Sequence, residues 1–90
     1  MFEWDENKAA ENFRKHAVSF EQIVGFDFTT AMIEVDNRRA YGEERLVALG
    51  LIGFRVYCAC YTMRGENKRV ISLRKANDRE IRKYVEYTEA

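Results

Sequence analysis

A chain of 90 residues has room for one domain, and a content of 47% apolar and 33% charged side chains is typical of a globular protein and excludes a disordered one. No apolar run approaches the roughly 20 residues of a membrane span, and the acidic segment 1–6 lacks the basic-then-apolar layout of a signal peptide, so we expect a cytoplasmic protein. The net charge is zero, but the surplus of eight basic over five acidic side chains in residues 61–90 would draw a polyanionic partner to that third, unless these are ordinary solvated charges.

The first third of the chain predicts two short helices. Asp5 is placed to cap a helix over 6–16, because its side chain can accept the free amides of the first turn. Ser19 with Gln22 three residues later has the pattern of a capping box, so a second helix is expected from there to Gly25, which can take a left-handed cap. The two helices together predict a helical hairpin.

The middle of the chain predicts strands. Gly50 and Gly53 bracket a turn between two runs that are rich in leucine, valine and aromatic residues, as in an antiparallel hairpin. A second turn is expected around Gly65. The segments predicted as strands are 2–4, 31–35, 44–49, 54–63 and 69–74.

The last predicted element is a helix. Asn77 and Glu80 have the spacing of a capping box, and one apolar face of the helix should pack on the sheet. That face comprises Ile81, Tyr84, Val85 and Thr88. The predicted architecture of residues 1–90 is therefore a single α+β domain, with an N-terminal helical hairpin, an antiparallel sheet of four to five strands and a C-terminal helix.

A series of short motifs runs from residue 2 to about residue 85. The motifs are Phe2-Glu3-Trp4-Asp5, Lys8, Asn12, Lys15-His16-x-Val18-Ser19-Phe20, Gly42-Glu43-x-Arg45, Tyr61-Thr62-x-Arg64, Ile71-Ser72-x-Arg74-Lys75-Ala76, Arg79-Glu80 and Tyr84. In order, spacing and total length, the chain resembles the BrnT family, a branch of the RelE-like ribonuclease toxins. It departs from the family pattern at Asp27-Phe28-Thr29-Thr30, where an Asp-Pro pair is frequent, and at Leu73, where many members have a small residue.

The resemblance implies a RelE-like fold and an RNA-binding hydrolase activity that cuts RNA and arrests growth. It also implies a BrnA antitoxin as partner, which covers the toxin and represses the shared operon. The toxin would then reach operator DNA only through the antitoxin.

RNA can be cleaved without a metal or cofactor when its 2′-hydroxyl attacks the adjacent phosphate, provided that protons are moved and the dianionic transition state meets cations. Arg64 lies at a strand end beside a glycine, and Arg74 shares a strand face with Ser72. Arg79 lies in the first turn of the last helix, against the preference of the helix dipole. We expect the three guanidinium groups to converge in one anion pocket.

His16 and Tyr84 are the candidates for moving protons, because the first can titrate near neutral pH and the second follows the basic motifs. The alternatives are a partly buried interhelix histidine and a core tyrosine. The residues expected to bind RNA are Lys8, Lys15, Ser72 and Lys75.

Cys58 and Cys60 are the only cysteines and share one strand face, where we interpret them as small apolar residues. No metal ligand set or cofactor motif is expected. A second hypothesis stays open, because no conventional general base is obvious. It holds that the chain is a catalytically silent antitoxin-binding module of a DNA-binding autorepressor complex.

Overall fold

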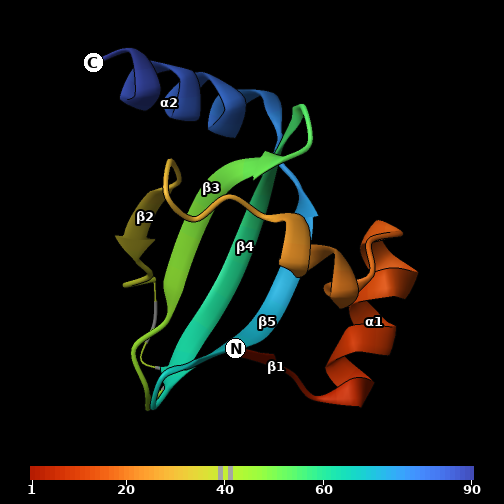
Figure 1. Cartoon of the computed structure of the whole chain (residues 1–90). Coiled ribbons are helices and arrows are strands. Elements are labelled where there is room, and N and C mark those ends of the chain that lie inside the picture. The colour runs from red at the N-terminus through yellow and green to blue at the C-terminus, as the bar shows by residue number, and fades with distance from the viewer. Residues whose placement is uncertain (39, 41) are drawn as a thin grey trace.

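The computed structural model of the chain describes residues 1–38, 40 and 42–90. Figure 1 shows a twisted sheet with α1 and η1 beside it and α2 lying across one end. The elements in chain order are β1 (Phe2–Glu3), α1 (Glu6–His16), the 3-10 helix η1 (Phe20–Gly25), β2 (Met32–Val35), β3 (Leu46–Ile52), β4 (Arg55–Arg64), β5 (Asn67–Lys75) and α2 (Asp78–Glu89). No helix in this described part of the chain has the length and apolar character needed to cross a bilayer.

The sheet has five strands in the order β1-β5-β4-β3-β2. The three pairs from β2 to β5 are antiparallel, but β1 pairs in parallel with β5, with Phe2 opposite Lys68. The sheet is therefore mixed, and the prediction of an antiparallel sheet was wrong at this edge. Strands joined by a short turn must be antiparallel, whereas β1 and β5 are separated by most of the chain and can pair in either direction.

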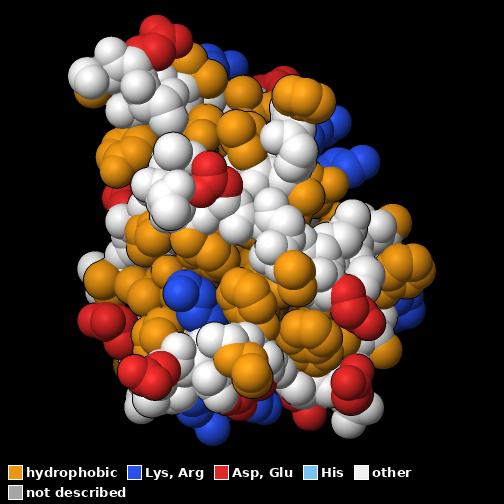
Figure 2. Space-filling view, viewed as in Figure 1, with side chains coloured by type: hydrophobic (Ala, Val, Ile, Leu, Met, Phe, Trp, Pro, Cys, Tyr) orange, Lys and Arg blue, Asp and Glu red, His pale blue; other side chains and the backbone are white. Residues whose placement is uncertain are grey.

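The two faces of the sheet bury separate clusters. On β4, Tyr57, Ala59 and Tyr61 pack toward η1, while Val56 and Cys58 pack toward α2. The buried residues that complete the first cluster are Val18, Phe20, Ile23, Phe26, Ala31, Ala48, Val70 and Leu73. Figure 2 shows hydrophobic side chains gathered across the middle of the face that carries η1. Helices on both faces thus leave one stretch of sheet between α1 and α2 open to solvent.

The N-terminal helices differ from the expected hairpin. Asp5 caps α1 through the amide of Lys8, as predicted, and Ala17 in the left-handed region ends the helix. The second helix is a six-residue 3-10 turn, capped by Ser19 through the amide of Glu21 and not through Gln22. It ends without a left-handed glycine at position 25, so the helical hairpin is not confirmed, and neither is the RelE-like fold.

α1 lies along the edge of β5 that β1 leaves unpaired. The buried amide of Asn12 donates to the carbonyl of Leu73 at 2.8 Å and accepts from its amide at 3.1 Å. The same group also donates to the carbonyl of Val18 at 3.0 Å. Asn12 therefore takes the place of a neighbouring strand and satisfies backbone groups that an open edge would leave bare.

A bulge in β5 decides which side chains face the groove beside α1. Cys60 pairs with Ser72, but the next residue of β4 pairs with Val70, so Ile71 is the extra residue. Val70 and Leu73 are consequently both buried in the core although they are three positions apart. Ile71 therefore lies next to Ser72 on the side of α1 and not in the core beside Leu73.

The turn between β3 and β4 lies at Gly53 and Phe54, so Gly50 belongs to β3 and does not bracket the turn. A glycine is needed at position 50 because the ring of Phe26 packs on its Cα. A Cβ atom there would lie 2.7 Å from Phe26 Cζ and 3.1 Å from the Cβ of Ala31.

The variant Gly50→Ala is therefore expected to lower the free energy of unfolding by about 1–3 kcal/mol, since the new methyl must displace a buried ring. Urea denaturation measures the change. Gly25→Ala is the matched control, because its Cβ would make only an ordinary 3.6 Å contact and should cost little. Equal midpoints for the two variants would contradict the close packing at Gly50.

The C-terminal helix begins as predicted. The Asn77 side chain accepts from the Glu80 amide at 2.9 Å, and the Glu80 side chain accepts from the Asn77 amide at 2.9 Å. Of its expected apolar face, Tyr84 is buried and Ile81 is partly buried, whereas Val85 and Thr88 are exposed. The helix therefore contacts the sheet through its first half.

Candidate functional site

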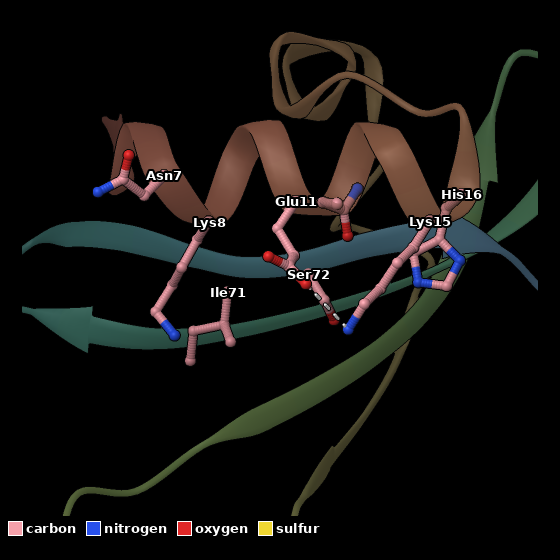
Figure 3. A pocket seen from close by; sticks show the side chains of 8 residues that line it. Asn7, Lys8, Glu11, Lys15, His16, Ile71 and Ser72 are labelled. Carbon is pink, nitrogen blue, oxygen red and sulfur yellow. Dashed lines mark ion pairs between the residues drawn. The ribbon is translucent and has the colours of Figure 1, made fainter.

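A first groove of about 390 Å³ lies between α1 and β5. Figure 3 shows Glu11 and Lys15 reaching from α1 toward Ser72 on β5, Lys8 descending beside Ile71, and His16 at the end of the helix. The two lysines line the same groove because residues seven apart lie on one face of a helix. The full lining is Asn7, Lys8, Glu11, Asn12, Lys15, His16, Ile71 and Ser72.

The basic side chains of this first groove form few and long ion pairs. Lys15 Nζ lies 3.5 Å from Glu11 Oε1, but that oxygen is closer, at 2.8 Å, to Arg14. Lys8 and His16 have no ion pair within residues 1–38, 40 and 42–90. All three side chains are solvent-exposed, and the two lysines can therefore attract an anion that enters the groove.

A second groove of about 420 Å³ lies on the open sheet face and meets the first at Ser72, which lines both. Its floor includes Val47, Cys58 and Cys60, and its walls carry ion pairs. The pairs are Arg38–Asp36 at 2.9 Å, Arg74–Glu80 at 2.8 Å and Lys83–Glu34 at 2.9 Å. The second groove is therefore nearly charge-balanced, unlike the first.

The pair of Arg74 and Glu80 joins β5 to α2. Nη1 and Nη2 of Arg74 donate to Oε1 and Oε2 of Glu80, both at 2.8 Å. This bidentate bond is the main reason why the pKa of Glu80 lies below its ordinary value and the pKa of Arg74 above its own. The pair fixes the start of α2 against β5.

The two cysteines share the second groove, as their spacing predicted. Burial raises the pKa of the Cys58 thiol to about 11 and also raises that of Cys60. Both thiols are therefore protonated at neutral pH, which makes them poor nucleophiles. In the described ranges no three His, Cys, Asp or Glu side chains come together as a metal site.

Arg64 is not part of either groove as described. It is the last residue of β4 and pairs with Asn67, whereas Arg74 pairs with Cys58 at the other end of the same hairpin. Six strand positions separate the two pairs, which corresponds to about 20 Å. Arg64 instead lies near Glu3, whose pKa is lowered mainly by Asn67 and Arg69 and slightly by Arg64. Arg64 and Arg74 therefore cannot hold the same phosphate.

Three further predicted residues lie away from the grooves. Arg79 is exposed in the first turn of α2, and Lys75 is exposed at the end of β5, but neither is among the described residues that line a groove. Tyr84 is 7% exposed and packs with Leu49 and Val56, as the core alternative held. The expected single pocket of three arginines is thus not what the geometry shows.

The groove residues that sequence reasoning did not assign are mainly acidic or amide side chains. Glu80 was noted only as part of a capping box, although the same carboxylate holds Arg74. Asn12 was noted only as a motif residue, although it joins α1 to β5. Glu11 lies one helical turn from Lys8 and from Lys15, a spacing that could have placed it in the groove.

Comparison with known proteins identifies the lineage. A family model described as the ribonuclease toxin BrnT of type II toxin-antitoxin systems matches residues 4–80, which include α1, the whole sheet from β2 to β5 and the start of α2. A search of the curated proteins gave no match. The matched range contains every residue of both grooves except Lys83. The chain therefore belongs to the BrnT family of type II toxin-antitoxin ribonuclease toxins.

Proposed function

We propose that the chain is a metal-independent endoribonuclease whose RNA substrate lies along the first groove and over Ser72 onto Arg74. The observation that carries this proposal is a groove beside Ser72 that is lined by Lys8, Lys15 and His16 and in which the lysines form few ion pairs. Membership of a ribonuclease toxin family supplies the reaction class.

The chemistry follows from the side chains in that groove. His16 takes the proton of the RNA 2′-hydroxyl while that oxygen bonds to phosphorus. The bond from phosphorus to the 5′-oxygen breaks, and water protonates the leaving oxygen. Lys8 and Lys15 stabilise the negative charge that gathers on the phosphate oxygens in the transition state. The products are a 2′,3′-cyclic phosphate and a 5′-hydroxyl end, and no metal ion takes part.

A BrnA-type antitoxin is proposed as the protein partner. Membership of a type II toxin-antitoxin family is what supports an antitoxin partner. The antitoxin would close the RNA site, and the complex would meet operator DNA only through the antitoxin. The free toxin would stop growth by destroying RNA needed for translation, in the cytoplasm.

The test is an RNA digest in the presence of a chelator. Purified chain with EDTA should fragment a long RNA and leave 5′-hydroxyl ends, which polynucleotide kinase labels directly. Purified antitoxin encoded by the neighbouring gene should stop the digest when added in equimolar amount. RNA that stays intact with and without divalent metals, and with ribosomes added, would instead support the silent antitoxin-binding module.

A further inference from the structure

Glu80 occupies an unusual position for a carboxylate in an RNA-binding surface. It lines the second groove beside Arg74 and Ser72, where its negative charge repels a phosphate backbone. The contacts of Glu80 indicate what it contributes to this surface.

Glu80 is held from two directions. Its Oε1 accepts from the backbone amide of Asn77 at 2.9 Å, which ties it to the first turn of α2. Both of its oxygens accept from the end of the Arg74 guanidinium. The side chains of Arg74 and Glu80 are 34% and 21% exposed, so the pair is partly shielded and its geometry is better defined than that of a surface ion pair.

The pair leaves one edge of Arg74 unused. A guanidinium carries five N–H groups, and Glu80 takes one from each terminal nitrogen. Within the described ranges the only other bond of Arg74 is a long one of 3.4 Å from Nη1 to the Lys75 carbonyl, so Nε and the second Nη2 hydrogen have no partner. That edge is a fork of two parallel donors, which matches two oxygens of one phosphate.

We propose that Glu80 is a positioning residue, which locks Arg74 so that its free Nε–Nη2 edge faces the RNA phosphate that lies over Ser72. The inference rests on the proposed function, since it names how one cation of that RNA site is aimed. Arginine side chains have many rotamers, and an arginine fixed before the RNA arrives loses less conformational freedom on binding. Glu80 thus improves the orientation of Arg74 and does not add positive charge to the site.

The variant Glu80→Gln separates orientation from helix capping. The glutamine carbonyl oxygen can still accept from the Asn77 amide, because glutamine also serves in a capping box. It cannot accept both donors of Arg74, so the guanidinium is released. Single-turnover cleavage of a short fluorescent RNA should fall roughly ten- to a hundredfold in kcat, the range expected when a catalytic contact is misplaced by about 1 Å.

The sign of the binding change distinguishes this role from a charge effect. Removal of a negative charge beside a polyanion tightens binding, so the KM of Glu80→Gln should stay the same or fall while kcat falls. The matched control is Glu86→Gln, an exposed position on the same helix with no contact to either groove, which makes the same change in net charge. Its kcat should equal that of the wild type.

A double-substitution cycle provides the decisive readout. In an Arg74→Ala background, Glu80→Gln should produce no further loss of kcat, because no guanidinium remains to be oriented. Equal losses in both backgrounds, or an unchanged kcat for Glu80→Gln alone, would overturn the positioning role. A wild-type chain that does not cleave RNA would instead refute the proposed function, so the two failures are distinguishable.

Discussion

Replacement of Asn12 by alanine is expected to lower the free energy of unfolding by about 3 kcal/mol. The variant loses three hydrogen bonds and leaves the amide and carbonyl of Leu73 and the carbonyl of Val18 without their partner. Each buried polar group without a partner costs about 1–3 kcal/mol. A domain of this length has about 5–13 kcal/mol in all, so the loss should lower Tm by more than about 10 °C.

The measurement is thermal and urea unfolding followed by circular dichroism. Asn7→Ala is the matched control, because this asparagine lies on the same helix and is exposed. It should unfold with the wild type, within about 0.5 kcal/mol. If Asn12→Ala unfolded with the control, Asn12 would not be the residue that closes the edge of β5.

Replacement of His16 by alanine is expected to reduce the rate of RNA cleavage about 10²- to 10⁴-fold, the usual contribution of a general acid or base. His16 is the only histidine of the chain, and it lies at the exposed C-terminal end of α1. The fold should be unaffected, because the side chain is not buried.

The control for charge is Arg82→Ala, which removes a cation on α2 that lines neither described groove. It should cleave RNA at the wild-type rate. Lys15→Ala should fall between the two variants, because it removes a phosphate contact and leaves the proton transfer intact. A His16→Ala variant with full activity would remove His16 from the mechanism and leave the first groove as a binding surface only.

Local signals were sufficient for the parts of the fold that depend on neighbouring residues. Asp5 and Asn77 cap the two α-helices where their patterns predicted, since a cap requires only three or four consecutive residues. The β4–β5 hairpin likewise turns at Gly65, which has a φ of 62°. In these segments the few consecutive residues that signal the structure are also the residues that form it.

The parts that could not be predicted depend on residues far apart in the chain. Nothing near Phe2 shows that β1 will pair with Lys68, and nothing near Asn12 shows that its amide will meet Leu73. The bulge at Ile71 shifted one side chain out of the core, although the alternation of the strand indicated the opposite. Contacts between residues far apart in the chain decide each of these features, and the local preference of a segment for helix or strand does not.

The candidate site shows the same division. Lys8, Lys15 and His16 were each proposed from the sequence, and helical spacing brings them together. Arg64 and Arg74 were expected to meet because their strands are neighbours and both residues belong to the basic C-terminal third. The hairpin register separates them, because one lies beside the turn and the other at the open end of the strands. The motifs therefore supplied candidate side chains but did not determine which of them lie in one groove.

The two walls of the first groove are α1 (Glu6–His16) and β5 (Asn67–Lys75), which are joined by the rest of the sheet. A ribosome making this protein must therefore translate past residue 75 before the groove exists. Until then the lysines of α1 have no Ser72 beneath them, and the nascent chain carries no assembled nuclease. Contacts of such wide sequence separation also form late in folding. The proposed nuclease site is therefore a late product of synthesis, completed only once β5 has joined α1.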